Sequence, residues 1–419
     1  MKKILIIDDC PTILKAFEIK IVETNKNIQI LSATTYAQAN EIIRQNRGSI
    51  YAAIVDLNLP DCTSGKAALL TNSHKIPTII FTGNNNKDLK SLLSKKDILD
   101  YIQKSSPESI QYAVNFITRI IRNNETTAMI VDDSELSRRT FKDDLKKLRI
   151  NVVEACDAKE ALEIIEKSEK QISLVLIDYY MPNMDGIELT KILRKKYKKD
   201  SLSIIAISGT EDESVLTEFI KAGANDYLSK PYKFEELNVR IHSNLDILEL
   251  FQKTKDLANK DFLTGTYNRR YFFDVTKEII KNNKKDDKSI ALFALDIDYF
   301  KKINDNYGHA VGDEALKNVK AVLDKTLKSE ELVTRFGGEE FCILIENISY
   351  EDTEKISEKI RIDFEQSEIK IDDYIVKYTV SMGISYGKMD NIDDALKIAD
   401  NALYEAKDNG RNQVIIKHI

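Results

Sequence analysis

Cysteine and histidine are scarce in this sequence, which limits the sites that the chain could build. Its 419 residues include four of each, and no two cysteines have the Cys-x-x-Cys spacing. Structural zinc sites need closely spaced thiol and imidazole ligands, so we expect none here. Scattered cysteines are also typical of reduced proteins, so we expect a cytoplasmic protein. The four thiols belong to Cys10, Cys62, Cys156 and Cys342.

Long apolar runs and an excess of positive charge are also missing. A membrane-spanning helix needs roughly 18 or more apolar residues, and no run in the sequence approaches that length. The first residues look like the start of a signal peptide, but Asp8 and Asp9 end the apolar stretch too early. The net charge of −6 offers no basic surface for nucleic acid. We therefore expect neither a membrane nor a nucleic acid among the partners.

The first 250 or so residues contain an internal repeat. Apolar runs that end in acidic, hydroxyl or lysine residues occur twice in the same order, 122 to 126 residues apart. The first set consists of Asp8, Asp9, Asp56, Thr82 and Lys104, and the second of Asp132, Asp133, Asp178, Ser208 and Lys230.

Helical patterns lie between these apolar runs, for example over residues 37–43 and 158–165. Strands that alternate with helices predict a parallel sheet with helices on both faces. Functional groups in such a sheet gather beyond the carboxyl ends of the strands, where all of these side chains would lie. Acidic residues that merely cap helices would explain one or two positions, but not the same set repeated in order.

A second acidic pattern is Arg335-Phe-Gly-Gly-Glu-Glu-Phe341, with apolar runs on both sides. The two glycines predict the turn of a β-hairpin, because glycine tolerates positive φ angles and lets a ligand approach the backbone. Glu339 and Glu340 would then stand beside the turn. A surface hairpin with a solvated acidic tip explains this stretch alone about as well as a functional site does.

The apolar run over residues 290–295, which ends in Asp296-Ile297-Asp298, favours the functional site. Asp296 at the end of a buried strand could share one site with Glu339. Carboxylates that share a site without a cation raise each other's pKa, so a bound metal ion is the simplest explanation. Oxygen ligands of this kind suit Mg²⁺, which also binds substrate phosphates.

With these motifs, the last 160 or so residues resemble the GGDEF-domain diguanylate cyclases, here with a Gly-Gly-Glu-Glu-Phe signature. The resemblance is carried in order by residues 261–270, residues 296–305, the signature and residues 406–412. It implies that two GTP molecules are joined into cyclic di-GMP, with release of two pyrophosphates. One domain holds one GTP, so the reaction requires a two-fold homodimer.

The same resemblance implies a role for each site residue. Asp296, Glu339 and Glu340 would be catalytic. Asp296, the Ile297 carbonyl and Glu339 would bind Mg²⁺, and Glu339 or Glu340 would help to deprotonate the attacking 3′-hydroxyl. The substrate contacts would be Asn304 and Asp313 to guanine, the Phe300, Lys301, Gly337 and Gly338 amides to phosphates, and Lys407 and Arg411 to the β- and γ-phosphates.

Each half of the internal repeat resembles a response-regulator receiver domain. That resemblance implies that Asp56 and Asp178 accept a phosphoryl group from a sensor histidine kinase or a phosphotransfer protein. The other four aspartates of the two repeated sets (Asp8, Asp9, Asp132 and Asp133) would hold Mg²⁺ together with the two acceptors. The switch residues Thr82, Lys104, Ser208 and Lys230 would contact the acquired phosphate.

These assignments predict an α/β chain with two tandem flavodoxin-like (βα)5 receivers, over residues 1–123 and 126–247, and an α/β cyclase domain over 258–419. Apolar residues at helical spacing predict a linker helix over 235–260. Its stripe suits either core packing or a dimer seam, and we expect a dimer seam because the reaction needs two copies. The polar residues 282–288 predict a loop. The stripe consists of Leu237, Ile241, Leu245, Leu248 and either Phe251 or Gln252.

The expected function is therefore a phosphorylation-regulated diguanylate cyclase. The alternatives are a catalytically inactive GGDEF module that senses nucleotide, and a related cyclase with another base preference. The sequence departs from the family at one place. Many members carry Arg-x-x-Asp five residues before the signature and bind inhibitory product there, whereas this chain has Lys328 and Glu331. Lysine lacks the bidentate fork of arginine, so we expect weak or absent product inhibition through this site.

Overall fold

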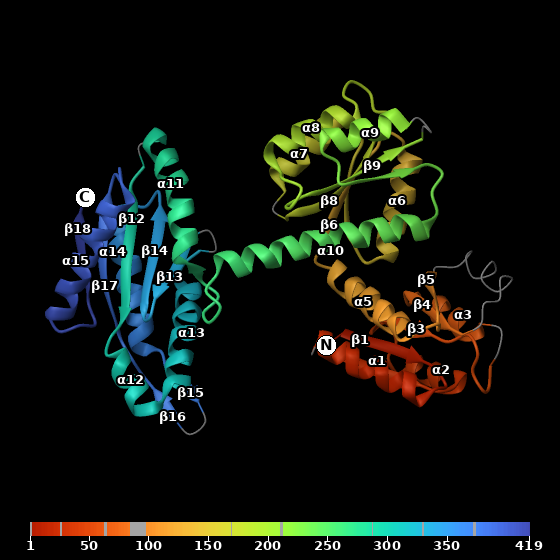
Figure 1. Cartoon of the computed structure of the whole chain (residues 1–419), viewed down its shortest axis with the longest axis horizontal. Coiled ribbons are helices and arrows are strands. Elements are labelled where there is room, and N and C mark those ends of the chain that lie inside the picture. The colour runs from red at the N-terminus through yellow and green to blue at the C-terminus, as the bar shows by residue number, and fades with distance from the viewer. Residues whose placement is uncertain are drawn as a thin grey trace. The chain divides into compact units, whose positions relative to one another are not determined.

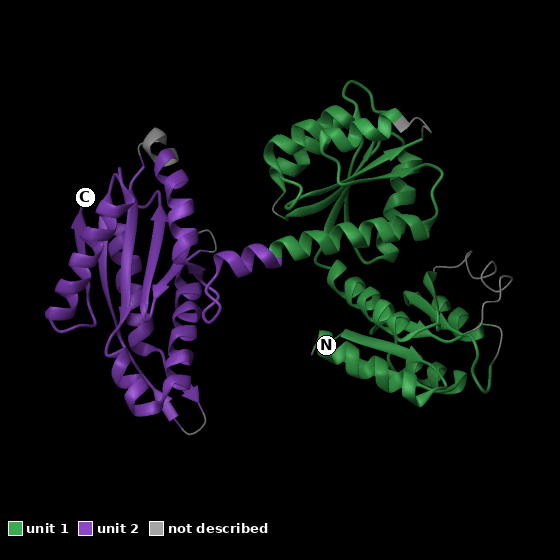
Figure 2. Ribbon diagram, in the orientation of Figure 1, with its two compact units in different colours: residues 1–252 green, residues 253–419 purple. Residues whose placement is uncertain are grey.

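The chain forms two compact units, residues 1–252 and residues 253–419 (Figure 2). The structure is a computed structural model. It describes residues 2–25, 27–62, 65–83, 98–168, 170–209, 213–286, 288–328, 331–371 and 374–419.

The first unit begins with a five-stranded parallel sheet whose strand order is β2-β1-β3-β4-β5, with helices on both of its faces (Figure 1). The β-branched and alanine-rich runs of its inner strands are buried on both faces, as a covered parallel sheet requires. The strands are β1 (Lys2–Ile7), β2 (Ile28–Ala33), β3 (Ile50–Val55), β4 (Thr78–Thr82) and β5 (Ile98–Gln103), and the helices are α1 (Pro11–Thr24), α2 (Tyr36–Gln45), α3 (Lys66–Ser73) and α5 (Pro107–Asn123).

The second half of this unit repeats the topology, with the strand order β10-β9-β8-β6-β7. The prediction of two flavodoxin-like sheets is confirmed, while the exact domain boundaries stay a prediction. The strands are β6 (Thr127–Val131), β7 (Asn151–Ala155), β8 (Ile172–Asp178), β9 (Ser203–Ser208) and β10 (Asp226–Ser229), and the helices are α6 (Glu135–Lys147), α7 (Ala158–Lys167), α8 (Gly186–Lys196), α9 (Glu213–Ala222) and α10 (Phe234–Asn259).

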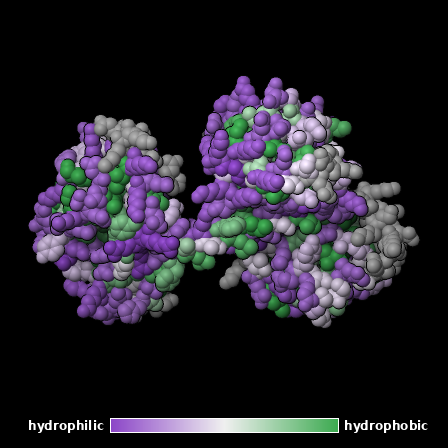
Figure 3. Space-filling view, turned by 45° about the horizontal axis from the view of Figure 1, so that its top comes forward, coloured by the Kyte–Doolittle hydropathy of each residue, from purple (hydrophilic) through white to green (hydrophobic). Residues whose placement is uncertain are grey.

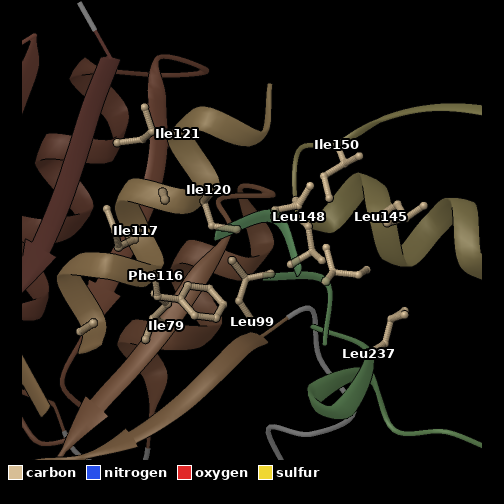
Figure 4. Packing of buried hydrophobic residues seen from close by; sticks show 14 of the residues in the cluster. Ile79, Leu99, Phe116, Ile117, Ile120, Ile121, Leu145, Leu148, Ile150 and Leu237 are labelled. Atoms are coloured by element: carbon tan, nitrogen blue, oxygen red, sulfur yellow. The ribbon is translucent and has the colours of Figure 1, made fainter. Parts of the chain in front are cut away.

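One apolar cluster runs through both halves of the first unit (Figure 4). Leu99 and Phe116 of the first half belong to it together with Leu148 and Leu237 of the second. Beside the cluster, the almost fully buried Arg119 of α5 pairs with carboxylates of α10, at 2.6 Å to Glu249 and more closely to Asp246. A buried guanidinium needs such partners, so these pairs tie α5 and α10 together.

Helix α10 confirms the predicted helix, but its apolar stripe packs differently from the expected seam. Leu237, Ile241 and Leu245 are buried in the shared cluster, and Leu248 packs against it. A second stripe of α10 is exposed instead, with Ile247, Leu250 and Leu257 at exposed fractions of 47%, 62% and 83%. The predicted stripe therefore belongs to the core, because this face of α10 packs against the apolar cluster of the first unit.

His242 gives the first unit a predicted dependence on pH. The ring is buried, with its centroid 4.7 Å from that of Phe116 and Arg119 nearby. Burial, and to a smaller degree the Arg119 charge, lowers the pKa of His242 to about 3. Below about pH 6.5 this histidine therefore binds a proton in the unfolded chain but stays neutral in the folded chain. The free energy of unfolding then decreases as the pH falls below that value.

We expect this histidine to cost about 1.4 kcal/mol of stability per pH unit below about 6.5, or about 2 kcal/mol at pH 5. Urea unfolding at pH 7.5 and pH 5 measures the difference. His242→Gln should remove most of the slope, whereas His74→Gln, at the other histidine of the first unit, should leave it. An unchanged slope in His242→Gln would contradict the assignment.

The second unit is built on a six-stranded sheet of order β11-β13-β14-β12-β17-β18, with a separate β15-β16 hairpin. β12 lies antiparallel to both β14 and β17, and β13 and β14 form the predicted hairpin. The strands are β11 (Tyr267–Asn268), β12 (Ile290–Ile297), β13 (Leu332–Gly337), β14 (Glu340–Glu346), β15 (Ile369–Ile371), β16 (Tyr374–Val376), β17 (Val380–Gly387) and β18 (Val414–His418), and the helices are α11 (Arg269–Asp286), α12 (Phe300–Tyr307), α13 (His309–Thr326), α14 (Tyr350–Gln366) and α15 (Ile392–Asp408).

The predicted loop over 282–288 is wrong over most of its length, because α11 continues to Asp286. Polarity was a poor guide here: lysine is a good helix former, and no glycine or proline stands between Arg269 and Asp286 to end the helix. Hydrophilic residues cover most of the visible surface in Figure 3, with small apolar patches between them. Among the described residues, no helix is both long and apolar enough to cross a membrane.

Candidate functional site

The carboxylate of Asp296 is the centre of the candidate site in the second unit. It lies at the end of β12, only 5% exposed, opposite Glu340 of β14 in the antiparallel register. Lys407, in the last turn of α15, brings its Nζ to 2.8 Å from Asp296 Oδ2. The fold thus brings together three residues that lie more than 40 residues apart in the chain.

The surroundings of Asp296 make its negative charge costly. Burial, followed by the smaller effects of the Glu339 and Glu340 charges, raises its pKa to about 6, although Lys407 lowers it. The single ammonium group of Lys407 cannot compensate the charge of every carboxylate in this cluster. A set of oxygen donors with excess negative charge suits a hard divalent cation. These residues therefore suit a hard divalent cation.

The glycine turn beside Asp296 has open space around it and is fixed by an arginine side chain. Gly337 and Gly338 have φ angles of 153° and 55°, and a Cβ on either would meet nothing within 4 Å. Arg335 fixes the turn by donating from Nε and Nη2 to the Gly338 carbonyl at 3.0 and 2.7 Å. Its Nη1 also pairs with Asp261 at 3.0 Å. The sequence motifs contained Arg335 and Asp261, but no spacing rule links residues so far apart.

The two residues that were predicted to contact guanine come from neighbouring helices. Asn304 of α12 lies directly against Gly312 of α13, where an added Cβ would stand 2.0 Å from Asn304 Oδ1. Asp313 follows Gly312 and is exposed. The contact needs glycine at this position, and it puts the Asn304 amide next to the turn of helix that carries Asp313.

The predicted phosphate contacts outside the glycine turn lie at helix ends. Phe300 and Lys301 open α12, and the first backbone N–H groups of a helix have no acceptor within it. Arg411 follows α15 and donates from Nη1 to the Lys407 carbonyl at 3.3 Å. Its guanidinium also lies over the Tyr299 ring, 4.5 Å from the centroid. Amides and two cations are thus available for an anionic ligand.

In the first half of the first unit, the predicted residues meet at the carboxyl ends of the strands. Lys104 Nζ lies 2.7 Å from Asp8 Oδ2 and 2.5 Å from Asp56 Oδ2. Asp8, Asp9 and Asp56 each offer an oxygen within 4.8 Å of the others, so they could hold one metal ion. Thr82 is fully buried at the end of β4.

The second half has the same constellation. Lys230 Nζ lies 2.8 Å from Asp132 Oδ2 and 2.6 Å from Asp178 Oδ1. Ser137 also donates to Asp132. Asp133 is exposed next to this site, and the fully buried Ser208 ends β9. Within the described part of the chain, only the first half brings three carboxylates close enough for a single ion.

The lysines do not remove the cost of burying these acids. Burial raises the pKa of Asp8 and of Asp178, more than the hydrogen bonds from Lys104 and Lys230 lower it. Burial alone would lower the pKa of each lysine, but its two carboxylate partners raise it, so both ammonium groups stay charged. Each site therefore combines carboxylates whose negative charge is costly to bury with a fixed cation, which suits a dianionic phosphoryl group.

Comparison with known proteins identifies the families of both kinds of domain. The family model of the response regulator receiver domain matches residues 4–115 and 128–242, and that of the "Diguanylate cyclase, GGDEF domain" matches residues 258–413. A solved "two-component system response regulator/GGDEF domain protein" is 37% identical, with a TM-score of 0.53, over 59% of this chain and all of that one.

Two curated proteins are also similar in sequence to parts of this chain. Response regulator PleD of Caulobacter vibrioides is 29% identical over 300 residues, which cover 69% of this chain and 65% of that protein. Diguanylate cyclase A of Treponema denticola is 34% identical over 167 residues, 38% of this chain and 45% of that protein. The chain thus spans less than two thirds of the length of either relative.

The receiver model alone covers more than half of the chain, and the solved relative carries a GGDEF domain as well. The chain therefore belongs to the response regulators in which receiver domains are followed by a GGDEF domain of the diguanylate cyclase family.

Proposed function

We propose that this chain is a phosphorylation-controlled diguanylate cyclase that condenses two GTP into cyclic di-GMP and two pyrophosphates. The observation that carries the proposal is the buried Asp296 carboxylate beside an open glycine turn, with Lys407 at 2.8 Å. A nucleotide triphosphate needs a carboxylate-bound cation, a backbone that lets phosphates approach, and fixed positive charge. In this proposal, residues of the second unit would meet each of these requirements.

Mg²⁺, when bound, would neutralise the triphosphate and polarise the α-phosphate. We assign Asp296, the Ile297 carbonyl and Glu339 as its ligands. Of the two glutamates, Glu339 has the larger effect on the pKa of Asp296. We assign the exposed Glu340 as the group that accepts the proton of the attacking 3′-hydroxyl, since its carboxylate faces solvent beside Asp296.

The other residues would bind and orient GTP. Asn304 and Asp313 would read guanine, the carboxylate accepting from the base N–H donors. Lys407 and Arg411 would hold the β- and γ-phosphates, so that the α-phosphate faces the 3′-hydroxyl of a second GTP. The backbone amides of Phe300, Lys301, Gly337 and Gly338 would complete the phosphate contacts.

A two-fold homodimer would bring the two GTP molecules face to face. The exposed residues Ile247, Leu250 and Leu257 of α10 share one face at heptad spacing, which suits a second copy of this helix. Phosphorylation of Asp56 or Asp178 by a histidine kinase or phosphotransfer protein would control how the copies pair. The four cysteines are free thiols, which fits our assignment to the cytoplasm.

The decisive experiment incubates the full chain with GTP and Mg²⁺, with and without beryllofluoride as a phosphoryl mimic, and separates the nucleotides by chromatography with mass detection. We expect cyclic di-GMP to form faster with the mimic. Asp56→Asn and Asp178→Asn should show which receiver carries the effect. Equal rates with and without the mimic would refute the control, and bound GTP without product would indicate an inactive nucleotide-sensing module.

Weak product inhibition is a separate prediction. Lys328 is exposed, and the Glu331 carboxylate accepts from the Lys328 backbone N–H at 2.9 Å, so it is already used within the turn. Titration calorimetry with cyclic di-GMP should give no sub-micromolar site in this stretch. Lys328→Arg together with Glu331→Asp should strengthen binding, whereas Lys325→Arg, a matched surface change, should not. Sub-micromolar binding that is lost in Lys328→Ala would contradict the prediction.

A further inference from the structure

Asp298 follows Asp296 by two residues and has no role in the site described above. It is 4% exposed, and its carboxylate accepts three hydrogen bonds. Two come from β17 and its preceding residue: Thr379 Oγ1 donates to Oδ2 and Ser381 Oγ to Oδ1, each at 2.7 Å. The third comes from the backbone N–H of Asn412, 3.0 Å from Oδ2.

The bond to Asn412 joins Asp298 to the segment that carries Arg411. Arg411 and Asn412 have φ angles of 66° and 47°, a left-handed conformation that residues other than glycine adopt reluctantly. Such a conformation persists only where its surroundings hold it. The Asn412 side chain is held by Arg361 and Glu365 of α14, at 2.9 and 2.8 Å. Asp298 holds its backbone.

The residue after Asp298 contacts the Arg411 side chain itself. Tyr299 has a φ of 56°, and its ring lies under the Arg411 guanidinium at 4.5 Å and under Lys302 Nζ at 4.3 Å. One dipeptide at the end of β12 therefore fixes both the backbone and the guanidinium of the Arg411 segment. The same strand end carries Asp296.

We propose that Asp298 is a positioning residue that sets Arg411 relative to Asp296 for recognition of the β- and γ-phosphates. The inference rests on the proposed function, since it concerns the triphosphate part of that GTP site. A buried carboxylate with three donors is a rigid connection, and it links the strand end of the metal ligand to the segment of the phosphate ligand. Removing it should weaken binding of the outer phosphates and spare binding of the guanosine and the α-phosphate.

The experiment measures two affinities by titration calorimetry on the full chain with Mg²⁺. The probes are GMP and a GTP analogue whose α–β bridging oxygen is replaced by methylene. In Asp298→Ala the analogue should bind about tenfold or more weakly, while the affinity for GMP should change less than about threefold. Arg411→Ala should show the same selective loss. The double variant should lose no more selectivity than Arg411→Ala alone, because both changes act through one guanidinium.

Asp298→Asn guards against loss of folding, because it keeps an oxygen for the Asn412 N–H, and it should show a smaller selective loss. Ser381→Ala is the matched control, because it removes a bond to Oδ1 only, and it should leave the ratio of the two affinities unchanged. The proposal would be overturned if Asp298→Ala or Asp298→Asn weakened the binding of both probes equally, or if both variants left the ratio of the two affinities unchanged. Full additivity of the two changes in the double variant would overturn it as well. If the unaltered chain bound neither probe, the proposed function would fail and this inference with it.

Discussion

Asp296→Asn should reduce cyclic di-GMP formation by about a hundredfold to a thousandfold, the range found when one group that stabilises transition-state charge is removed. The substitution keeps the size of the side chain but removes the charge that would hold a cation. Lys407, now 2.8 Å from the carboxylate, would lose its partner as well. Initial rates at saturating GTP and Mg²⁺, followed by chromatography, measure the loss.

The control for this prediction is Asp324→Asn, which neutralises an exposed acid of α13 whose partner is Lys320. It should leave the rate unchanged. The pH dependence gives a second test, because the pKa of Asp296 is raised to about 6. Protons should therefore compete with Mg²⁺ as the pH falls toward 6, and more Mg²⁺ should be needed for half-maximal rate. Full activity in Asp296→Asn would remove this residue from the catalytic site.

The strand-end residues show how much could be read from the sequence. Apolar runs that end in acids gave the parallel sheets, and the doubled order of Asp56 and Asp178 gave two domains of one topology. These signals are local, since each depends on a run of neighbouring residues followed by a polar one. The structure then adds distances: the ammonium groups of Lys104 and Lys230 each reach two carboxylates.

Contacts between distant segments were beyond the sequence. Arg335 with Asp261, and Asp298 with the Asn412 backbone, join residues 74 and 114 positions apart. No periodicity encodes such pairs, because the partner is chosen by the fold. The prediction that this stripe of α10 forms a dimer seam was wrong for a related reason. Helical spacing identified an apolar face at Leu237 and Ile241, but it could not identify the element that covers this face. Spacing predicts that a face is buried, whereas tertiary structure decides against which element.

Gly383→Ala should destabilise the second unit by about 3 kcal/mol, at the upper end of the usual cost of overpacking. A Cβ at this position of β17 would stand 2.0 Å from the Leu403 nitrogen and 2.2 Å from the Ala399 oxygen. Both are backbone atoms of α15, which cannot rotate away as a side chain would. The helix approaches this closely because small residues line its buried face, at Ala395, Ala399, Ala402 and Ala406.

The displacement should reach the candidate site, because α15 also carries Lys407. If α15 moves away from β17, Lys407 moves away from Asp296, and the rate should fall in the fraction that stays folded. Urea unfolding and initial rates, measured on the same sample, separate the two effects. Ser385→Ala is the matched control: it lies two residues along the same strand and face, and its buried hydroxyl has no hydrogen-bond partner among the described residues. Removing that hydroxyl should cost little stability. If Ser385→Ala lost as much stability as Gly383→Ala, β17 would tolerate no change at all, and the specific contact with α15 would not be the cause.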